Sequence, residues 1–146
     1  MLWQELRLAE ERSHGIEPDQ RERGHAAAKP TAQIRLNVWL ETTEGMLFGM
    51  GRAQLLEKIE ECGSLKKAAE DMGMSYRAAW GKLKKTEEVL GFRLIEKDRG
   101  NRKGYRLTEA GMALKTSYRD WHRLIRKEAL RAARELFPWI ATPGEE

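Results

Sequence analysis

Three short helical patterns in close succession constrain the fold of this 146-residue chain more than any other feature. The expected helices span residues 52–62, 65–72 and 76–90. A glycine follows each helix, and a serine precedes the second and the third: Gly63, Gly73, Gly91, Ser64 and Ser75. Serine side chains cap helix N-termini, and glycine readily adopts the left-handed conformation that ends a helix. Two helices joined by a short turn that contains glycine form a helix-turn-helix.

A basic hairpin is expected directly after the third helix. Residues 92–97 have the composition of a strand, and residues 98–104 form a turn with two glycines and three basic side chains. Residues 105–107 then return as a short strand. A hairpin in this position is the wing of a winged helix. We therefore expect a mainly α fold with a small β wing, an α+β winged helix-turn-helix.

A second hairpin is expected before the helices. Residues 33–40 alternate between apolar and polar side chains, which indicates a half-buried strand. The side chains on its apolar side are Ile34, Leu36, Val38 and Leu40. Residues 41–45 have the composition of a turn, and residues 46–48 form a return strand. Residues 1–31 are polar and lack an apolar partner, so we expect a mobile N-terminal tail.

A long final helix is expected over residues 109–137, with Thr108 as its cap and Pro138 at its end. At about 1.5 Å per residue it is roughly 40 Å long, more than a small domain needs. An apolar stripe follows it at alternating three- and four-residue spacings: Leu114, Tyr118, Trp121, Ile125, Ala132 and Leu136. Packing on the chain's own core accounts for the first turns. We expect the remainder to pair with the same helix of a second copy, which makes a homodimer.

These patterns divide the chain into four segments. They are a mobile N-terminal tail (1–31), a winged helix-turn-helix domain with its N-terminal hairpin (32–108), a long dimerisation helix (109–138) and a C-terminal tail (139–146).

Positive charge is concentrated in one part of the chain. The net charge is only +4, but residues 64–107 carry 12 Lys and Arg against 6 Asp and Glu, a net charge of +6. A local excess of this kind is typical of a surface that binds a polyanion, most often nucleic acid. A solvated, lysine-rich helix face is the alternative interpretation.

The third helix is the expected recognition helix, because the second helix of a helix-turn-helix enters the major groove. Arg77 is the main candidate for a base contact, since a guanidinium binds O6 and N7 of guanine through two hydrogen bonds. Trp80 either contacts DNA or covers the crossing of the two helices, and its spacing favours partial burial. The candidate DNA-binding residues are Ser64, Lys66, Lys67, Ser75, Tyr76, Arg77, Trp80, Lys82, Lys84, Lys85, Arg99, Asn101, Arg102 and Lys103.

Other functional classes lack their sequence signatures. No run approaches the ~20 apolar residues that span a bilayer, and the N-terminus has no secretory signal. The three histidines are scattered, and the single cysteine, Cys62, lies on an apolar helix face. We therefore expect no metal site, no disulfide and no cofactor. We expect a cytoplasmic protein that is not an enzyme and binds neither a membrane nor an evident small-molecule effector.

Four short motifs carry a family resemblance. They are Phe48-Gly-Met-Gly-Arg52, Gly63-Ser64-Leu65 with Ala68-Ala69, Gly73-Met-Ser-Tyr-Arg-Ala-Ala-Trp80 and Leu107-Thr-Glu-Ala-Gly111. Together they closely resemble the DNA-binding domain of ModE-type molybdate-responsive regulators, which is itself similar to the LysR-type winged helix. With the preceding hairpin and the long helix, the resemblance covers about residues 33–137. It implies DNA binding and dimerisation.

Two departures limit what the resemblance implies. The wing tip, residues 100–104, is shorter and more basic than the glycine-rich tip that regulators of this type often carry, so groove preferences are not carried over to it. The chain ends soon after the long helix, and we expect it to lack the C-terminal oxyanion-binding module of the family. The resemblance therefore does not imply molybdate sensing by this chain.

The sequence thus predicts a sequence-specific, DNA-binding transcription regulator of bacterial type. It would bind double-stranded DNA as a homodimer on a pseudo-palindromic operator, with one recognition helix in each half-site. Through the resemblance, the genes that it controls would relate to molybdate or another oxyanion. The alternative is a winged-helix module for protein–protein interaction without specific DNA readout.

Overall fold

A computed structural model of the chain describes residues 29–101 and 104–142. These residues belong to two compact units. Residues Arg35–Arg126 form one unit, and the described residues of Met1–Ile34 and Lys127–Glu146 form the other. Most of the predicted tails, residues 1–31 and 139–146, lies outside the described residues.

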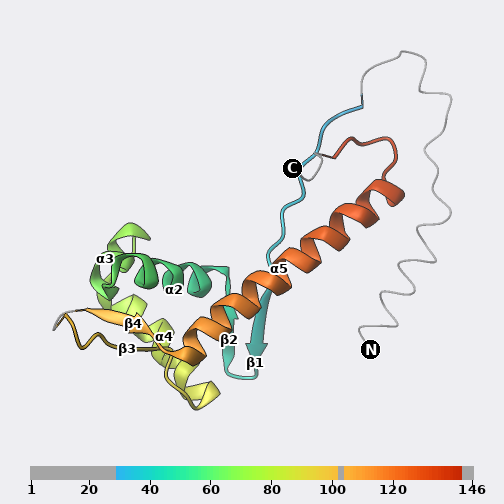
Figure 1. The fold of residues 1–146 in the computed structure, drawn as a ribbon. Coiled ribbons are helices and arrows are strands. Elements are labelled where there is room, and N and C mark those ends of the chain that lie inside the picture. Colours follow the sequence, from blue (N-terminus) through green and yellow to red (C-terminus); the bar gives the residue numbers. More distant parts are fainter. Residues whose placement is uncertain (1–28, 102–103, 143–146) are drawn as a thin grey trace. The chain divides into compact units, whose positions relative to one another are not determined.

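The unit of residues 35–126 is mainly helical, with two small antiparallel hairpins (Figure 1). The elements in chain order are β1 (Trp39–Thr42), β2 (Gly45–Gly49), α2 (Met50–Cys62), α3 (Leu65–Asp71), α4 (Tyr76–Leu90), β3 (Ile95–Lys97), β4 (Tyr105–Leu107) and α5 (Glu109–Leu136), which continues into the other unit. α3 and α4 form the helix-turn-helix, and β3 and β4 follow as the wing. The predicted winged helix-turn-helix fold is confirmed.

The ends of the three central helices are capped as the sequence predicts. The hydroxyl oxygens of Ser64 and Ser75 each accept a hydrogen bond from the backbone N–H three residues later, at 3.1 Å. Gly63 and Gly91 follow α2 and α4 in the left-handed conformation, with φ of 65° and 79°. Each residue therefore satisfies backbone groups that a helix end leaves without a partner.

The core of this unit forms where α2, α3 and α4 meet. Its fully buried side chains on the three helices are Ala53, Leu55, Leu56, Ile59, Leu65, Ala68, Ala69, Ala79 and Leu83. These are the faces that the helical spacing predicts to be apolar. Burial of each larger side chain contributes about 1.5–3 kcal/mol, which makes this cluster the main source of stability.

A buried arginine joins the N-terminal hairpin to α2. Arg52 is 7% exposed, and its guanidinium donates hydrogen bonds of 2.6 Å to the carbonyl oxygens of Met46 and Leu47. The hydroxyl of Thr86 on α4 donates to the same Leu47 carbonyl at 2.6 Å. Side chains of α2 and α4 therefore both bind the β2 backbone at residues 46–47.

The N-terminal hairpin starts later than predicted. The prediction of a strand over residues 33–40 is wrong, because β1 occupies Trp39–Thr42 and the turn lies at residues 43–44. β2 has five residues, and its last residue, Gly49, pairs with Trp39. Residues before Trp39 therefore have no part of β2 to pair with. α2 begins at Met50, two residues earlier than expected.

The wing is a short pairing in which residues 95–97 of β3 face residues 107–105 of β4. The strand expected over residues 92–97 begins only at Ile95, because β4 supplies three partners. The backbone before it binds the start of α5 instead. The Thr108 N–H donates to the Leu94 carbonyl at 2.9 Å, and the Thr108 hydroxyl donates to the Arg93 carbonyl at 2.6 Å.

The first half of α5 packs on the same core. Tyr118 is 3% exposed, and its ring meets that of Phe48 edge-on, with centroids 5.6 Å apart. Its hydroxyl donates a hydrogen bond of 2.8 Å to the Val38 carbonyl. Leu114 and Trp121 lie half-buried against the core on either side along the helix. Own-core packing therefore accounts for the first turns of α5, as the sequence predicts.

Two ion pairs also join α5 to α2. The Arg119 guanidinium binds both carboxylate oxygens of Glu57, and the Lys115 ammonium pairs with Glu60. The hydrogen bonds with Arg119 lower the pKa of the Glu57 carboxyl, and the same bonds raise the pKa of Arg119. Both helices are thus held in one relative position by charge as well as by apolar packing.

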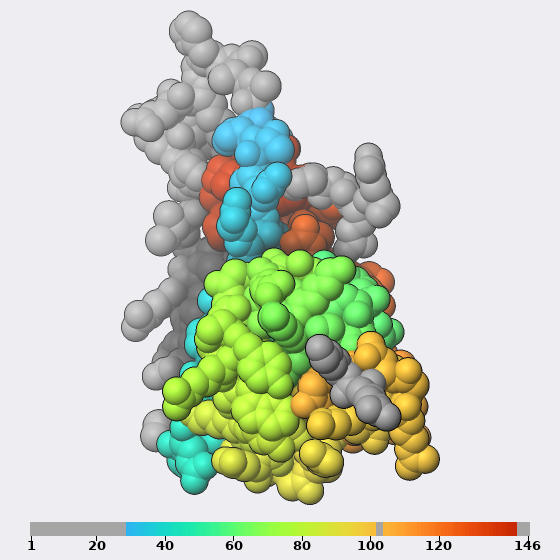
Figure 2. All heavy atoms as spheres, turned by 90° about the vertical axis from the view of Figure 1, so that its left-hand side faces the viewer, coloured from blue at the N-terminus to red at the C-terminus, as the bar shows by residue number. Residues whose placement is uncertain are grey.

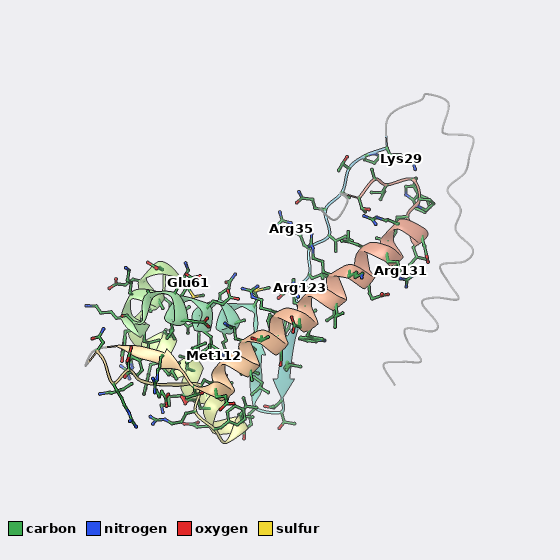
Figure 3. The ribbon with its side chains drawn as sticks, in the orientation of Figure 1. Lys29, Arg35, Glu61, Met112, Arg123 and Arg131 are labelled. Carbon is green, nitrogen blue, oxygen red and sulfur yellow. The ribbon has the colours of Figure 1, made fainter. Side chains whose placement is uncertain are left out.

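The charged side of α5 forms ion pairs within the helix. Arg123 pairs with Asp120 at 3.2 Å, and Arg131 pairs with Glu128 and Glu135 at 3.0 and 3.2 Å. Figure 3 labels Arg123 and Arg131 on α5. Such exposed pairs stabilise a helix only slightly.

The second unit contains the last turns of α5, Lys127–Leu136, and the residues that follow them. Thr31 and Ala141 form an isolated parallel β-bridge. The Ala32 N–H donates to the Ala141 carbonyl at 2.8 Å, and the Ala141 N–H donates to the Pro30 carbonyl at 2.9 Å. Backbone hydrogen bonds therefore join the described residues of the two predicted tails.

Candidate nucleic-acid interface

The recognition helix α4 has a buried face and an exposed face. Ala79, Leu83 and Thr86 are fully buried. The exposed residues in and just before its first two turns are Ser75, Tyr76, Arg77, Ala78, Gly81 and Lys82. The N-terminal half of the helix is therefore free to contact a ligand, as a helix that enters a major groove must be.

The elements that carry the predicted cations share one face of the molecule. Figure 2 shows this face, with α3 in green, α4 in yellow-green and the wing in orange. Lys66 and Lys67 on α3 are exposed, as are Lys82 and Lys85 on α4. The first two lie next to the N-terminus of α3, where backbone N–H groups favour an anion.

Arg77 is exposed at the second position of α4. It takes part in none of the ion pairs that the described residues form. Its five N–H donors are therefore not occupied by a carboxylate of this part of the chain, and a guanidinium in this state suits a base edge or a phosphate.

Trp80 packs within the domain and leaves part of its ring at the surface. The ring lies 6.2 Å from the ring of Tyr105 on the wing, and the Lys84 ammonium lies 4.8 Å above it. Lys84 also pairs with Glu87 at 3.9 Å. The partial burial expected for Trp80 is confirmed. The Lys84 ammonium interacts with the Trp80 ring and the Glu87 carboxylate of its own domain.

The tip of the wing is closed by backbone hydrogen bonds. The Asp98 N–H donates to the Gly104 carbonyl at 3.0 Å, and the Gly100 N–H donates to the Asp98 carboxylate at 3.0 Å. Arg99 and Asn101 are exposed. The predicted contacts of Arg102 and Lys103 lie outside the described residues.

Two residues that the sequence reasoning passed over belong to this surface. Tyr105 and Lys97 face each other across the wing, at the ends of β4 and β3 nearest the tip. Tyr105 contacts the recognition helix through Trp80, and Lys97 is exposed beside it. Their signal in the sequence is position alone, because the cross-strand partners next to the tip of a hairpin follow from its register.

The predicted dimer stripe contributes to an apolar hollow on the unit of residues 35–126. The hollow has a volume of about 310 Å³ and is lined by Leu40, Phe48, Leu114, Ser117, Tyr118 and Trp121. Tyr118 belongs to the core of this unit and is only 3% exposed, so little of its side chain remains at the surface. Leu114 and Trp121 are half-buried and keep exposed area at the hollow.

The stripe is less regular further along α5. Ile125 and Ala132 are half-buried, whereas Leu136 is 49% exposed. Leu130, which lies outside the predicted stripe, is 4% exposed. The apolar spacing alone therefore does not give the burial of each position in the last turns.

Within residues 29–101 and 104–142, no group of three or more His, Cys, Asp and Glu side chains could hold a metal ion. In the same part of the chain, no helix is both long enough and apolar enough to cross a membrane.

Comparison with known families identifies the domain that carries this surface. Residues 50–112 match the model of the lysR family of bacterial regulatory helix-turn-helix proteins. This stretch is therefore similar to the helix-turn-helix domain of that family. The match begins with α2 and ends in the first turn of α5, so it includes the helix-turn-helix and the whole wing.

Two curated relatives each match about half of the chain. It is 34% identical over 72 residues to the transcriptional regulator ModE of Haemophilus influenzae, covering 49% of this chain and 28% of ModE. It is 38% identical over 68 residues to the molybdenum-pterin-binding protein MopA of Rhodobacter capsulatus, covering 45% of this chain and 26% of MopA. The chain thus spans about a quarter of the length of these relatives. The expected likeness to ModE-type proteins is confirmed over this stretch.

A solved structure described as the CbnR_DBD-DNA complex is also similar. It has a TM-score of 0.47 and 22% sequence identity, and the match covers 58% of this chain and 94% of that one.

Proposed function

We propose that this protein is a sequence-specific, DNA-binding transcription regulator. The observation that supports this most strongly is a LysR-type helix-turn-helix domain whose recognition helix keeps its N-terminal face exposed. Arg77 on that face has no ion-pair partner among the described residues. The protein would act by binding and not by catalysis, in the cytoplasm, where bacterial chromosomal DNA lies.

In this proposal α4 enters the major groove with its N-terminal half. Arg77 binds the O6 and N7 atoms of a guanine, which gives sequence preference. Lys66 and Lys67, next to the N-terminus of α3, bind backbone phosphates and fix the register of the helix on the duplex. Arg99 at the wing contacts the neighbouring backbone or minor groove.

The regulator would bind its operator as a homodimer. α5 has 28 residues, and apolar side chains at its surface remain for a partner helix. A dimer with two-fold symmetry places two recognition helices in half-sites about 34–36 Å apart, one turn of the duplex. The preferred operator is therefore pseudo-palindromic.

A link to molybdenum is part of the proposal only at the level of the genes controlled. The matched relatives are named as ModE and as a molybdenum-pterin-binding protein, but about a quarter of each is matched. Once the operator sequence is known, its position in the genome identifies the genes that it controls. The products of those genes would show whether the regulon handles molybdenum.

The experiment that tests DNA binding is selection of bound duplexes from a random pool, followed by titration at several salt concentrations. We expect a two-fold symmetric consensus and an affinity that falls steeply with salt, with a slope of log K against log salt of about −0.9 for each phosphate contacted. Absence of salt-dependent duplex binding would contradict the proposal and favour the alternative, a winged-helix module for protein–protein interaction.

Replacement of Arg77 by Ala tests the docking. We expect it to weaken binding to the selected site by ~1–3 kcal/mol and to relax the preference at one base position. Arg123→Ala is the matched control, because it removes the same charge from an exposed site on α5. If both variants bind with equal affinity, Arg77 does not contact a base.

A further inference from the structure

One side chain spans the short connection between the recognition helix and the wing. The backbone carbonyl of Glu87, in the last turn of α4, accepts a hydrogen bond of 2.8 Å from the Gly91 N–H. Its carboxylate reaches past the end of the helix and accepts a second hydrogen bond, of 3.4 Å, from the Leu94 N–H. Leu94 is fully buried, and β3 begins at the next residue. Glu87 therefore binds both ends of the connection.

Leu94 is also held from its other side, where β4 leads into α5. Its carbonyl oxygen accepts a hydrogen bond of 2.9 Å from the Thr108 N–H. The backbone at the entrance to the wing thus has one partner on α4 and one at the start of α5. Glu87 itself is only 7% exposed. Because an unpaired buried carboxylate is costly, Glu87 depends on these contacts within the domain.

Glu87 is the last member of a row of three α4 side chains that contacts the wing. Trp80, Lys84 and Glu87 follow one another at spacings of four and three residues, so they lie along one side of the helix. The Lys84 ammonium lies 4.8 Å from the centre of the Trp80 ring and 3.9 Å from the Glu87 carboxylate. The Trp80 ring packs on that of Tyr105, the first residue of β4, with centroids 6.2 Å apart. The row therefore contacts the entrance to β3 at one end and the start of β4 at the other.

We propose that Glu87 is a positioning residue of the DNA interface, which fixes the wing against the recognition helix so that Arg77 and Arg99 meet one duplex together. This inference rests on the proposed function. Glu87 acts on the wing through the Leu94 backbone and needs no contact with DNA, in agreement with its burial. Because the wing is held in place before the duplex arrives, less conformational freedom is lost on binding.

A double-mutant cycle on the selected duplex tests the proposal. Glu87→Ala removes the acceptor for the Leu94 N–H, and Arg99→Ala removes an exposed cation of the wing. We expect each variant to bind about 3–10-fold more weakly than the wild type. Arg99→Ala should cost little in the Glu87→Ala background, because a wing that is not held no longer places Arg99 at the duplex. Losses that multiply, or wild-type binding by either single variant, would overturn the proposal.

The matched control cycle combines Glu87→Ala with Arg77→Ala. Arg77 lies on α4 itself, so its loss should multiply with that of Glu87→Ala. Partial unfolding caused by Glu87→Ala would give multiplying losses in both cycles, which separates a merely structural role from a positioning role. Glu87→Gln keeps an oxygen that can accept the Leu94 N–H, and we expect it to bind more tightly than Glu87→Ala. Equal losses in the Gln and Ala variants would count against the bond to Leu94.

Amide hydrogen exchange supplies a measurement that does not involve DNA. The Leu94 N–H should exchange several-fold faster in Glu87→Ala than in the wild type and keep its protection in Glu87→Gln. The Ala78 N–H, which Ser75 binds at the other end of α4, is the internal control and should not change. An unchanged rate at Leu94 would overturn the proposal. If the wild type binds no duplex even at low salt, the proposed function fails, while the exchange rates still decide whether Glu87 holds the entrance to the wing.

Discussion

At the scale of single residues, Gly111 shows why the start of α5 needs a glycine. A Cβ atom at this position would lie 2.1 Å from the Leu94 carbonyl oxygen, closer than any real contact. The Gly111 N–H donates to the Thr108 hydroxyl at 3.0 Å, and that hydroxyl donates to the Arg93 carbonyl. The glycine therefore lets α5 begin directly against the backbone that leads into the wing.

Gly111→Ala is expected to destabilise the domain by about 1–3 kcal/mol, because the added methyl group clashes with the Leu94 backbone and forces it to move. Gly51→Ala is the matched control, since that glycine also lies in a helix and has nothing within 4 Å of an added Cβ. The control should be stabilising by up to about 1 kcal/mol. Urea unfolding of both variants measures the difference, and a stable Gly111→Ala would refute the close approach.

The ion pair of Glu57 with Arg119 makes part of the stability depend on pH. Because the folded-state pKa of Glu57 is lowered, chiefly by its hydrogen bonds with Arg119, its contribution is present above the unfolded pKa of about 4.3 and is lost as pH falls through the lower folded value. Glu57→Gln should lower the free energy of unfolding by roughly 0.5–1 kcal/mol at pH 7 and by almost nothing at pH 2–3.

The control for this pair is Glu61→Gln on the same helix. Glu61 pairs with Lys58 at 3.3 Å, but its side chain is 66% exposed and the partners lie on one helix. Its replacement should change stability much less at either pH. Equal effects of the two replacements across the pH range would contradict a special role for the Glu57 pair.

At the scale of elements, the recognition helix owes its first turn to a serine. Ser75 accepts a hydrogen bond from the Ala78 N–H and begins the helix just before Tyr76 and Arg77. Ser75→Ala should destabilise the domain by about 1 kcal/mol, because the first turn loses its cap. Ser117→Ala, in the interior of α5, removes a hydroxyl without a capping role and serves as the control. Thermal unfolding compares them, and equal melting temperatures would argue against the cap.

The sequence predicts those elements whose ends are marked by local chemistry. Each serine cap and left-handed glycine around α2, α3 and α4 acts within a few residues, so the limits of these helices follow from the sequence. The N-terminal strand was misplaced because its limits depend on pairing with Gly49 across the hairpin. The role of Tyr105 was missed for the same reason, since its contacts with Gly63 and Trp80 join distant parts of the sequence.

At the scale of the whole molecule, the proposed dimer depends on exposed apolar surface on α5. Leu124 is 64% exposed and Ile125 next to it is half-buried, although both are strongly apolar. We expect the protein to sediment as a dimer at tens of micromolar, because a partner helix would remove this surface from water. A monomer at that concentration would contradict the pairing through α5.

Ile125→Glu is the variant that tests the stripe itself. A carboxylate in an apolar helix pair carries a desolvation cost of several kcal/mol, so this variant should sediment as a monomer. Arg123→Glu changes the charge by a larger amount at an exposed position outside the stripe and should remain a dimer. Sedimentation equilibrium of the two variants separates a specific interface from a general effect of charge.

The closure of the wing below its tip has a consequence for how such proteins diverge. The Asp98 N–H bonds to the Gly104 carbonyl across the wing, and the Tyr105 N–H bonds to the Gly63 carbonyl between α2 and α3, so both bonds involve backbone outside residues 99–103. Exchanges of side chains within this loop therefore leave these two bonds in place. In the proposed complex with DNA, a lineage can alter its contacts beside the central groove by changing five positions, and a protein engineer can graft tips between relatives in the same way.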